Sequence, residues 1–519
     1  MKSVKKLFSA ILVMFGVAFL VCAFGVALMM IFHISLFGYT FVSGDGSKIT
    51  QEYSEAETIA LKSVEIESSG VGVKIVNSTD DGFKKCIVSI SQGAQGVAKD
   101  TVKKNTFKDV EHPVIDENGV MKIETVEPTG FIWKNDSIIT ITLPKTKTLE
   151  NLRIKTASTN IIFGDSESNC SINNLSFTST NHSLVSNMAL TNIVSLENLD
   201  LNVQSGRMVI DANIANAVNI ETERAVIIFN KDIGGTVNIS GNNPDIQFGY
   251  IPDSYISDIE SGKSSTGLTE VNIGGDLNLI ELEKGSVRIA GTVGGCAYLN
   301  KSFVTFVANN INKGISCDEG LNDIKIIGAL RVENADGTCQ IKTTGALFIN
   351  ASHAKLVVDT SNNLTIKNAY ESVDVISSGG DTNIAFNKMA TSKTISVLQK
   401  NGNIEVSNIM DTANLTAENG KIVADFKNVS GNNNLRAKSG VEVTIKDGEQ
   451  FTLILQGKAT TKLDIKLGAV VYDNWKTSTE VGDLKFIQDN VKAGRDELLE
   501  DRLSILLEDG GNITAKFAN

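Results

Sequence analysis

The stretch LRAKSGVEVTIK, residues 435–446, decides the fold of this chain. Its odd-numbered residues are apolar or small, whereas its even-numbered residues, except Gly440, are charged or polar. Successive side chains of a β-strand point to opposite faces, so this period of two predicts strands with one buried face. The Ser439-Gly440 pair in the middle is typical of a turn. The stretch therefore predicts two short strands joined by a turn.

The same unit recurs along the chain at intervals of about 20 residues. First strands begin near residues 395, 415 and 435, and others near residues 152, 175, 199 and 218. Self-similarity at this period is typical of a solenoid, in which each repeat, or rung, buries its apolar face against the next. About 330 residues at this repeat predict on the order of 16 rungs.

Proline usage supports a stacked β-structure independently. The chain has five prolines, and none follows Pro252. In a solenoid nearly every strand has a neighbour on both sides and must donate its backbone N–H, which proline cannot do. The stretch 253–268, rich in Ser, Gly and Asp, interrupts the strand pattern, and we expect a loop excursion there.

The N-terminal segment predicts a membrane anchor. Residues 7–32 carry no charge, and apart from one histidine the uncharged stretch continues to Val42. About 20 apolar residues span a bilayer, so the segment is long enough to cross with tilt. Lys2, Lys5 and Lys6 precede it, and the positive-inside rule then places the N-terminus in the cytoplasm and the body of the chain outside.

A cleaved signal peptide is the rival interpretation of this segment. Such a peptide has an apolar region of about 7–15 residues that ends in small residues. The run here is longer, and Val21 stands before Cys22 where a lipoprotein signal needs a small residue. We therefore favour an uncleaved anchor, with a cleaved peptide and a buried helix as the alternatives.

Composition and charge exclude several classes of protein. The chain is 42% hydrophobic and 21% charged, which is typical of folded globular material and not of disorder. Its net charge is -12, whereas a nucleic-acid partner requires a cationic face to neutralise phosphates. We therefore expect no nucleic-acid partner.

The cysteines and histidines predict neither a disulfide framework nor a metal site. The six cysteines are widely spaced without a CxxC pair, and the four histidines lie far from them in sequence. Cys296, Cys317 and Cys339 recur at about one rung each, which raises the possibility of a redox or metal column. Cys317 alternates with Ile315, and Cys339 with Ile341, so we interpret the three as small buried side chains.

No catalytic, cofactor-binding or metal-binding residue is predicted. β-Solenoids also host polysaccharide lyases and glycosidases, whose sites need acids, bases or cations that converge on adjacent rungs. Glu405 and Asp425 are one repeat apart, but among 60 acidic residues such pairs are expected by chance. The Gly-Gly-Asp triplets at 274–276 and 379–381 are similar to the start of calcium-binding nonapeptide repeats. They are not in tandem, so we interpret them as turns.

Several segments together resemble the bacterial adhesin-like family of β-strand repeats. In ITITLPKTKTLENLRIKT, residues 139–156, a strand that ends in Leu-Pro leads into a first repeat, as in that family. Residues 64–75, 119–123 and 504–513 are similar to its opening hairpin, its next strand and its closing repeat. The resemblance covers residue 59 to the C-terminus. It implies a β-solenoid at the cell surface and supplies no catalytic residues.

The predicted chain is all-β apart from one N-terminal transmembrane helix, with a β-helix-like solenoid as its main body. The predicted parts are a cytoplasmic tip and anchor at 1–42, a linker at 43–58, a β-rich module at 59–150, the solenoid at 151–480 and a closing repeat or cap at 481–519.

The predicted function is that of a membrane-anchored, non-enzymatic surface scaffold. Its polar surface would bind matrix, glycan or protein, because the repeats carry no convergent catalytic set. The first alternative is an envelope sensor or assembly partner that works through a second membrane protein. The second alternative is a carbohydrate-active β-helix enzyme.

Overall fold

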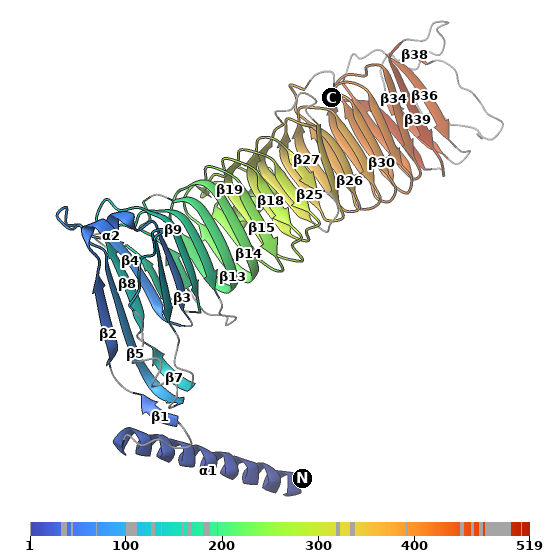
Figure 1. The fold of residues 1–519 in the computed structure, drawn as a ribbon. Coiled ribbons are helices and arrows are strands. Elements are labelled where there is room, and N and C mark those ends of the chain that lie inside the picture. The colour runs from blue at the N-terminus through green and yellow to red at the C-terminus, as the bar shows by residue number, and fades with distance from the viewer. Residues whose placement is uncertain are drawn as a thin grey trace. The chain divides into compact units, whose positions relative to one another are not determined.

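Parallel strands stacked in turns of about 20 residues make up most of the structure, which is a computed structural model (Figure 1). The turns number about 14, against the 16 expected from the repeat length. The chain divides into two units, residues 1–215 and residues 216–519. The residues that the structure describes are 2–32, 39–42, 45–68, 70–99, 112–125, 130–135, 137–157, 160–164, 168–179, 187–194, 196–317, 322–332, 338–390, 393–446, 451–457, 461–466, 471–472, 500–509 and 511–518.

The first unit contains two helices and thirteen strands among its described residues. They are α1 (Lys2–Phe32), β1 (Tyr39–Val42), β2 (Asp45–Glu52), α2 (Glu55–Ala60), β3 (Ser63–Ser68), β4 (Gly72–Asn77), β5 (Ile87–Lys99), β6 (Val120–Thr125), β7 (Gly130–Asn135), β8 (Ile138–Leu143), β9 (Leu149–Thr156), β10 (Ile161–Phe163), β11 (Ile172–Ser179), β12 (Asn187–Leu190) and β13 (Leu196–Ile210).

A mixed sheet and a parallel ladder organise these strands. In the mixed sheet β5 is antiparallel to β1, β2, β7 and β8, while β8, β4 and β10 are parallel to one another. The ladder runs in the order β6, β3, β9, β11 and β13, with every pair parallel. The predicted N-terminal β-structure is therefore present, with β3 and β4 already part of parallel ladders.

The second unit begins with β14 (Ile214–Phe229), which starts at the end of the first. Its other elements are β15 (Val237–Gly241), β16 (Asp245–Tyr250), α4 (Asp253–Glu260), β17 (Thr269–Glu270), β18 (Leu277–Ile280), β19 (Ser286–Val293), β20 (Ala297–Asn300), β21 (Thr305–Ile311), β22 (Ile315–Cys317), β23 (Asp323–Leu330), β24 (Thr338–Thr343), β25 (Leu347–Ser352), β26 (Lys355–Thr360), β27 (Leu364–Ala369), β28 (Val373–Ser377), β29 (Thr382–Phe386), β30 (Ile395–Gln399), β31 (Ile404–Ile409), β32 (Ala413–Ala417), β33 (Lys421–Phe426), β34 (Asn432–Ala437), β35 (Gly440–Ile445), β36 (Thr452–Gly457), β37 (Lys462–Lys466), β38 (Val471–Tyr472), β39 (Arg502–Leu507) and β40 (Asn512–Phe517).

Each rung of this unit gives one strand to each of two parallel sheets. Sheet I contains the first half of β14 followed by β15, β18, β20, β22, β24, β26, β28, β30, β32, β34, β39, β36 and β38. Sheet II contains the second half of β14 followed by β16, β19, β21, β23, β25, β27, β29, β31, β33, β35, β40 and β37. The predicted parallel β-solenoid is confirmed.

The core lies between the two sheets and follows the predicted alternation. Leu435 and Ala437 of β34 are buried, as are Val441, Val443 and Ile445 of β35, while the residues between them face outward. The inward side chains of both sheets are buried in the same alternating pattern. Burial of a leucine or isoleucine in such a column stabilises the fold by about 1.5–3 kcal/mol.

The strand register confirms part of the predicted repeat spacing and corrects the rest. Leu152 is in register with Leu175, and Leu175 with Leu199, as the sequence predicts. The predicted 20-residue spacing between the strands near residues 395 and 415 is wrong. Leu415 is in register with Val397 and not with Ile395, so this repeat is two residues shorter than predicted. Rungs vary in length because the turns between strands differ, and equal spacing of sequence motifs does not detect this.

The last two strands of the chain do not form the last rung in space. β39 lies between β34 and β36, and β40 lies between β35 and β37. The described part of the closing repeat expected at 481–519, β39 and β40, is therefore an inner rung, and the earlier strands β36 and β37 lie outside it. A terminal strand is fixed in this way by hydrogen-bonded neighbours on both edges, which reduces fraying at the chain end.

The start of the solenoid has the same inverted order. β3 lies between β6 and β9, and β4 lies between β8 and β10. The first rung in sequence is therefore again an inner rung in space. The antiparallel strand β5 then covers the free edge of β8.

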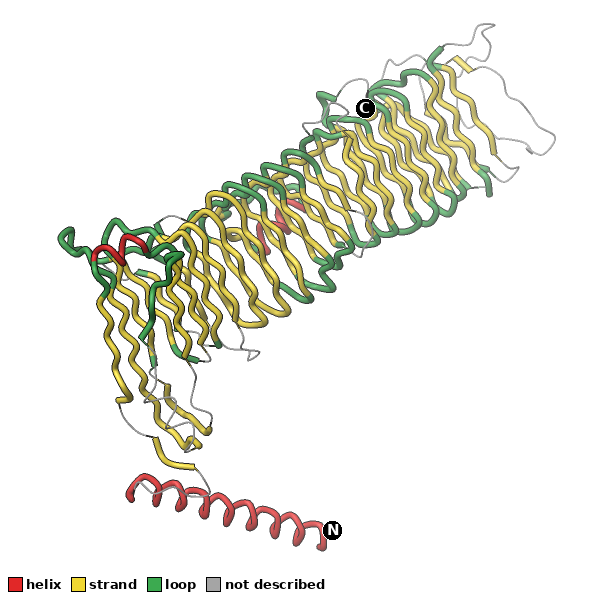
Figure 2. Tube along the Cα trace, in the orientation of Figure 1, coloured by secondary structure: helices red, strands yellow, loops and turns green. Residues whose placement is uncertain are grey.

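The stretch expected to form a loop at 253–268 contains the helix α4, which packs against the outer face of sheet II (Figure 2). Ile256 of the helix is buried with Ala290, Val307 and Ile327 of the sheet. Lys367 Nζ donates to two carbonyl oxygens at the helix C-terminus, at 2.8 and 2.7 Å. The favourable interaction of a cation with this end of a helix helps to hold α4 in place.

The apolar N-terminal segment forms the helix α1, as expected. In its described part the large apolar side chains are exposed on all sides of the helix, with Phe15 at 73% and Phe19 at 74% exposure. Within the residues that the structure describes, no helix is both long and apolar enough to cross a bilayer. The role of α1 as an anchor stays a prediction.

Candidate functional site

Rows of outward polar side chains run across sheet I. Asn238 Nδ2 donates to Asn219 Oδ1, and Asn278 Nδ2 donates to Asn238 Oδ1, both at 2.7 Å. Asn434 donates to Asn414 in the same way at 2.9 Å. These amide ladders join neighbouring rungs, so much of the polar surface contributes to stacking. A candidate ligand site is better sought where the surface is hollowed.

A groove of about 770 Å³ lies on sheet I between β18 and β28, which is a size typical of ligand sites. The lining residues share two properties: most project from sheet I, and they combine aliphatic, amide and charged side chains. They are Ile280, Glu281, Asn300, Lys301, Cys317, Gln340, Ile341, Lys342, Val357, Val358, Asp359, Asp374 and Ile376.

The groove follows one row of the ladder. Ile280 is in register with Asn300, and farther along Lys342 is in register with Asp359, which is in register with Ile376. Leu299, which precedes Asn300, is in register with Cys317, and Cys317 is in register with Ile341, which precedes Lys342. Asn300 and Lys342 therefore belong to the same row. The groove therefore runs across the strands, parallel to the direction in which the rungs stack.

The strands β22, β24 and β26 form the middle of the groove. Cys317 of β22 is in register with Ile341 of β24, which is in register with Val358 of β26. β24 and β26 continue to Thr343 and Thr360 and border the groove along this row.

The groove combines exposed aliphatic surface with both signs of charge. Ile280 and Ile376 are 41% and 57% exposed, although most large aliphatic side chains of this unit are buried. Glu281 and Lys301, at the ends of neighbouring strands, have positive φ angles of 52° and 48°. This conformation costs a residue with a side chain roughly 1–2 kcal/mol, and strain of this kind clusters at functional sites.

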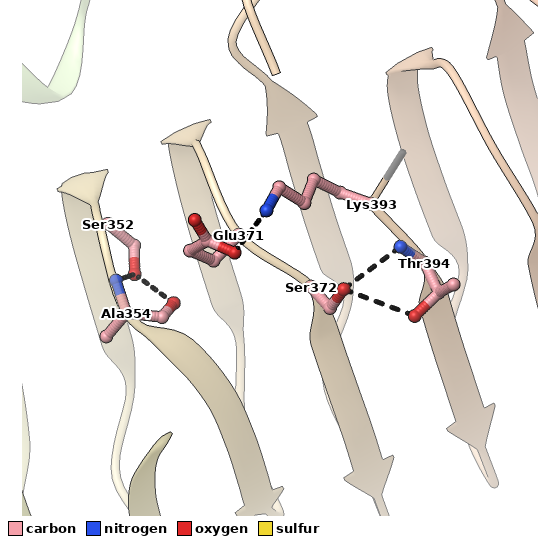
Figure 3. A network of polar contacts seen from close by, with 6 residues as sticks. All are labelled: Ser352, Ala354, Glu371, Ser372, Lys393 and Thr394. Carbon is pink, nitrogen blue, oxygen red and sulfur yellow. Dashed lines mark hydrogen bonds and ion pairs between the residues drawn. The ribbon is translucent and has the colours of Figure 1, made fainter. Parts of the chain in front are cut away.

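A second set of polar contacts occurs in the turns and not in the groove (Figure 3). Lys393 Nζ pairs with a Glu371 carboxylate oxygen at 2.6 Å, and the backbone N–H of Thr394 donates to Ser372 Oγ at 3.0 Å. Both contacts join successive rungs. They therefore stabilise the stack, as the amide ladders do.

Comparison with models of protein families, with curated proteins and with solved structures found no match. No family is therefore identified. The β-solenoid that the adhesin-like resemblance implies is confirmed by the strand register, and the resemblance itself rests on the quoted residues alone.

Glu405 and Asp425, the acidic pair considered from the sequence, are not in register with one another. Glu405 is in register with Val423, and Asp425 lies two residues farther along that neighbouring strand. Asp425 forms an ion pair with Lys427 at 2.8 Å. The geometry thus gives these two carboxylates no shared site.

The two Gly-Gly-Asp triplets lie in turns. Asp276 Oδ1 accepts the backbone N–H of Cys296, and Asp381 Oδ1 accepts that of Asn403, each at 2.8 Å. The carboxylates hold the next rung in place, which agrees with their interpretation as turn residues. No group of three or more His, Cys, Asp or Glu within the described residues could hold a metal ion.

Cys317 and Cys339 are buried, as predicted, but the three spaced cysteines do not form one column. Cys317 is in register with Ile341, two residues after Cys339. Cys296 is only half-buried, and its thiol donates to the carbonyl oxygen of Lys313 at 2.9 Å. The sequence missed the groove itself, because side chains from successive rungs form it and no residue motif marks it.

Burial predicts a strong difference in cysteine reactivity. It raises the pKa of the thiols of Cys86, Cys170 and Cys339 to about 12, because a buried thiolate loses its solvation. At pH 8 roughly one in ten thousand such thiols is ionised, and the thiolate is the nucleophile. We expect iodoacetamide to modify Cys296 of the folded protein at least tenfold faster than these three, as measured by peptide mass spectrometry. Equal rates in the folded protein would contradict the burial, whereas equal rates in denaturant are expected.

Proposed function

We propose that the protein is a β-solenoid scaffold, held on a membrane by α1, that presents its polar sheet faces to a ligand outside the cell. The ligand is a glycan, matrix or protein surface, and the scaffold itself catalyses no reaction. The observation that carries the proposal is the contrast between the polar outward rows of the stacked sheets and the apolar surface of α1. A helix that is apolar on all sides is typical of a membrane or of a protein core.

The geometry of the candidate groups supports a passive role. Glu405 and Asp425 do not face one another, and the aspartates of the Gly-Gly-Asp turns hold neighbouring rungs. A rigid stack of hydrogen-bonded rungs places its surface groups at fixed spacings of about 4.8 Å. Fixed spacing favours binding of an extended ligand to many rungs at once.

The anchor is tested by extraction of membranes from cells that express the full chain. We expect the wild-type protein to remain in the membrane after washing with alkaline carbonate. A variant with Val17→Lys and Leu20→Lys is expected to be released, because each lysine at a helix centre costs about 2.5–3.5 kcal/mol of insertion free energy. The matched control, Val17→Leu with Leu20→Val, should stay bound. Release of the wild type would contradict the anchor.

The orientation is tested by a cysteine introduced on sheet I. Asn414 is exposed, and Asn414→Cys in a Cys296→Ser background offers a thiol on the outer face. We expect a membrane-impermeant maleimide to label it on intact cells. Labelling only after lysis would place the solenoid inside and contradict the proposal.

A further inference from the structure

We propose that the groove on sheet I binds an extended, net basic peptide segment of a partner protein, with one large apolar side chain of the peptide packed against Ile376. This inference deepens the proposed scaffold function, because it names one ligand class and the place where it binds. It rests on the length of the groove, its charges and its exposed aliphatic side chains.

The length of the groove fits a short extended chain. It crosses five strand-to-strand steps from β18 to β28, through β20, β22, β24 and β26. At about 4.8 Å per step this is roughly 24 Å, or about seven residues of an extended peptide. The peptide lies across the strands, so its side chains and not its backbone ladder provide the recognition.

The charges select the chemistry of the ligand. Among the described residues the lining contains three carboxylates, from Glu281, Asp359 and Asp374, and the ammonium groups of Lys301 and Lys342, of which Lys342 already has a partner. The hydroxyl groups of a neutral glycan would hydrogen-bond to these carboxylates, but an Arg or Lys pairs with a carboxylate through a stronger, charge-assisted hydrogen bond. A polyanion would be repelled by the carboxylate excess and by the net charge of -12. A peptide with a basic excess complements the carboxylates of Glu281, Asp359 and Asp374.

The exposed isoleucines supply the apolar part of the site. Ile376 lies in the same row as Asp359, and Asp374 is two residues before it on the same strand. A large apolar side chain that packs on Ile376 therefore lies beside two carboxylates, where a neighbouring Arg or Lys of the peptide would pair. Interfaces are dominated by a few such anchors, surrounded by polar contacts.

Leu398 provides a matched control for Ile376. It is in register with Ile376 on the next strand, is also exposed at 42%, and does not line the groove. Ile376→Arg places a guanidinium beside Asp359 and Asp374 and so blocks the groove. Leu398→Arg makes the same chemical change one rung farther along. Both positions are on the surface, so we expect both variants to fold.

The test uses a library of random heptapeptides displayed on phage and the full-length protein in detergent micelles. We expect selection of peptides that combine a large apolar residue with Arg or Lys. A fluorescent copy of a selected peptide should bind Ile376→Arg at least tenfold more weakly than wild type and should bind Leu398→Arg equally well. Asp374→Lys should also weaken binding tenfold, and a peptide with its basic residue changed to Glu should restore it.

Several results would overturn the proposal. They are the absence of peptide enrichment over empty micelles, equal binding to the Ile376→Arg and Leu398→Arg variants, and displacement of bound peptide by neutral dextran. Each of these would leave the membrane-extraction and orientation results unchanged, so failure of the peptide site is distinguishable from failure of the scaffold function.

Discussion

A chain that ends after Tyr472 is expected to lose order in the two rungs that flank the rung it removes. This truncation removes β39 and β40, which lie between the rungs formed by β34–β35 and β36–β37. The lost strands bury Leu503, Ile505, Leu507 and Ile513, each worth about 1.5–3 kcal/mol of burial free energy. Among the described strands, β36 then keeps only β38 as a partner and β37 keeps none, so we expect the amides of this outer rung to exchange at least a hundredfold faster. Hydrogen exchange of β34–β37, read by mass spectrometry, measures this.

The matched control removes the outer rung and keeps the inner one. In this variant a turn copied from residues 427–431, which joins β33 to β34, replaces residues 447–501. β39 and β40 can then follow β34 and β35 in ordinary sequence order. We expect amide protection of β34 and β35 to stay within about threefold of wild type. If both variants lose protection equally, the inverted order of the last rungs is wrong.

The change Gly402→Ala is expected to destabilise the middle of the solenoid. Gly402 has φ +112°, and a Cβ there would lie 1.8 Å from the carbonyl oxygen of Gly380 on the neighbouring rung. The methyl group forces the rungs apart in addition to the backbone strain, so we expect a loss of about 3 kcal/mol or more in the free energy of unfolding. Urea denaturation followed by circular dichroism measures this loss.

Gly440→Ala is the corresponding control. A Cβ at Gly440 meets its nearest atom at 3.5 Å, and its φ is not in the left-handed region. The substitution also reduces the entropy of the unfolded chain, so we expect stability unchanged or raised by up to about 1 kcal/mol. An equal loss in the two variants would show that the close approach at Gly402 does not hold the rungs together.

Local pattern allowed the strands and their buried faces to be predicted from the sequence. The alternation in residues 435–446 and the spacing from Leu152 to Leu175 and Leu199 are both reproduced by the structure. These features depend on which side chains must leave water, and each segment carries that information by itself. The rung number was too high partly because Val237 is in register with Leu277, so the excursion that contains α4 lengthens one repeat.

Spatial order could not be predicted in the same way. Every rung has similar apolar columns, so nothing in residues 452–466 or 502–517 specifies which pair of strands lies farther out. The helix α4 was missed because its apolar side is short. Ile256 becomes buried only by packing on Val307 and Ile327 of sheet II, which are distant in the sequence. The groove likewise depends on pairing between rungs, which brings residues of β18 to β28 side by side, and not on a local motif.

Spin-label distances along one row of sheet I test the stacked-rung fold most directly. Gln340, Val357, Asp374, Ser396, Asn414 and Asn434 are in register on successive strands. Pulsed electron paramagnetic resonance on the full-length protein measures the distance between two spin labels. Labels at 374 and 434, three rungs apart, should be separated by about 14 Å, and labels at 340 and 434, five rungs apart, by about 24 Å, because each rung adds about 4.8 Å. The fold would be contradicted if the 340/434 separation were no longer than the 374/434 separation, or if it exceeded about 40 Å.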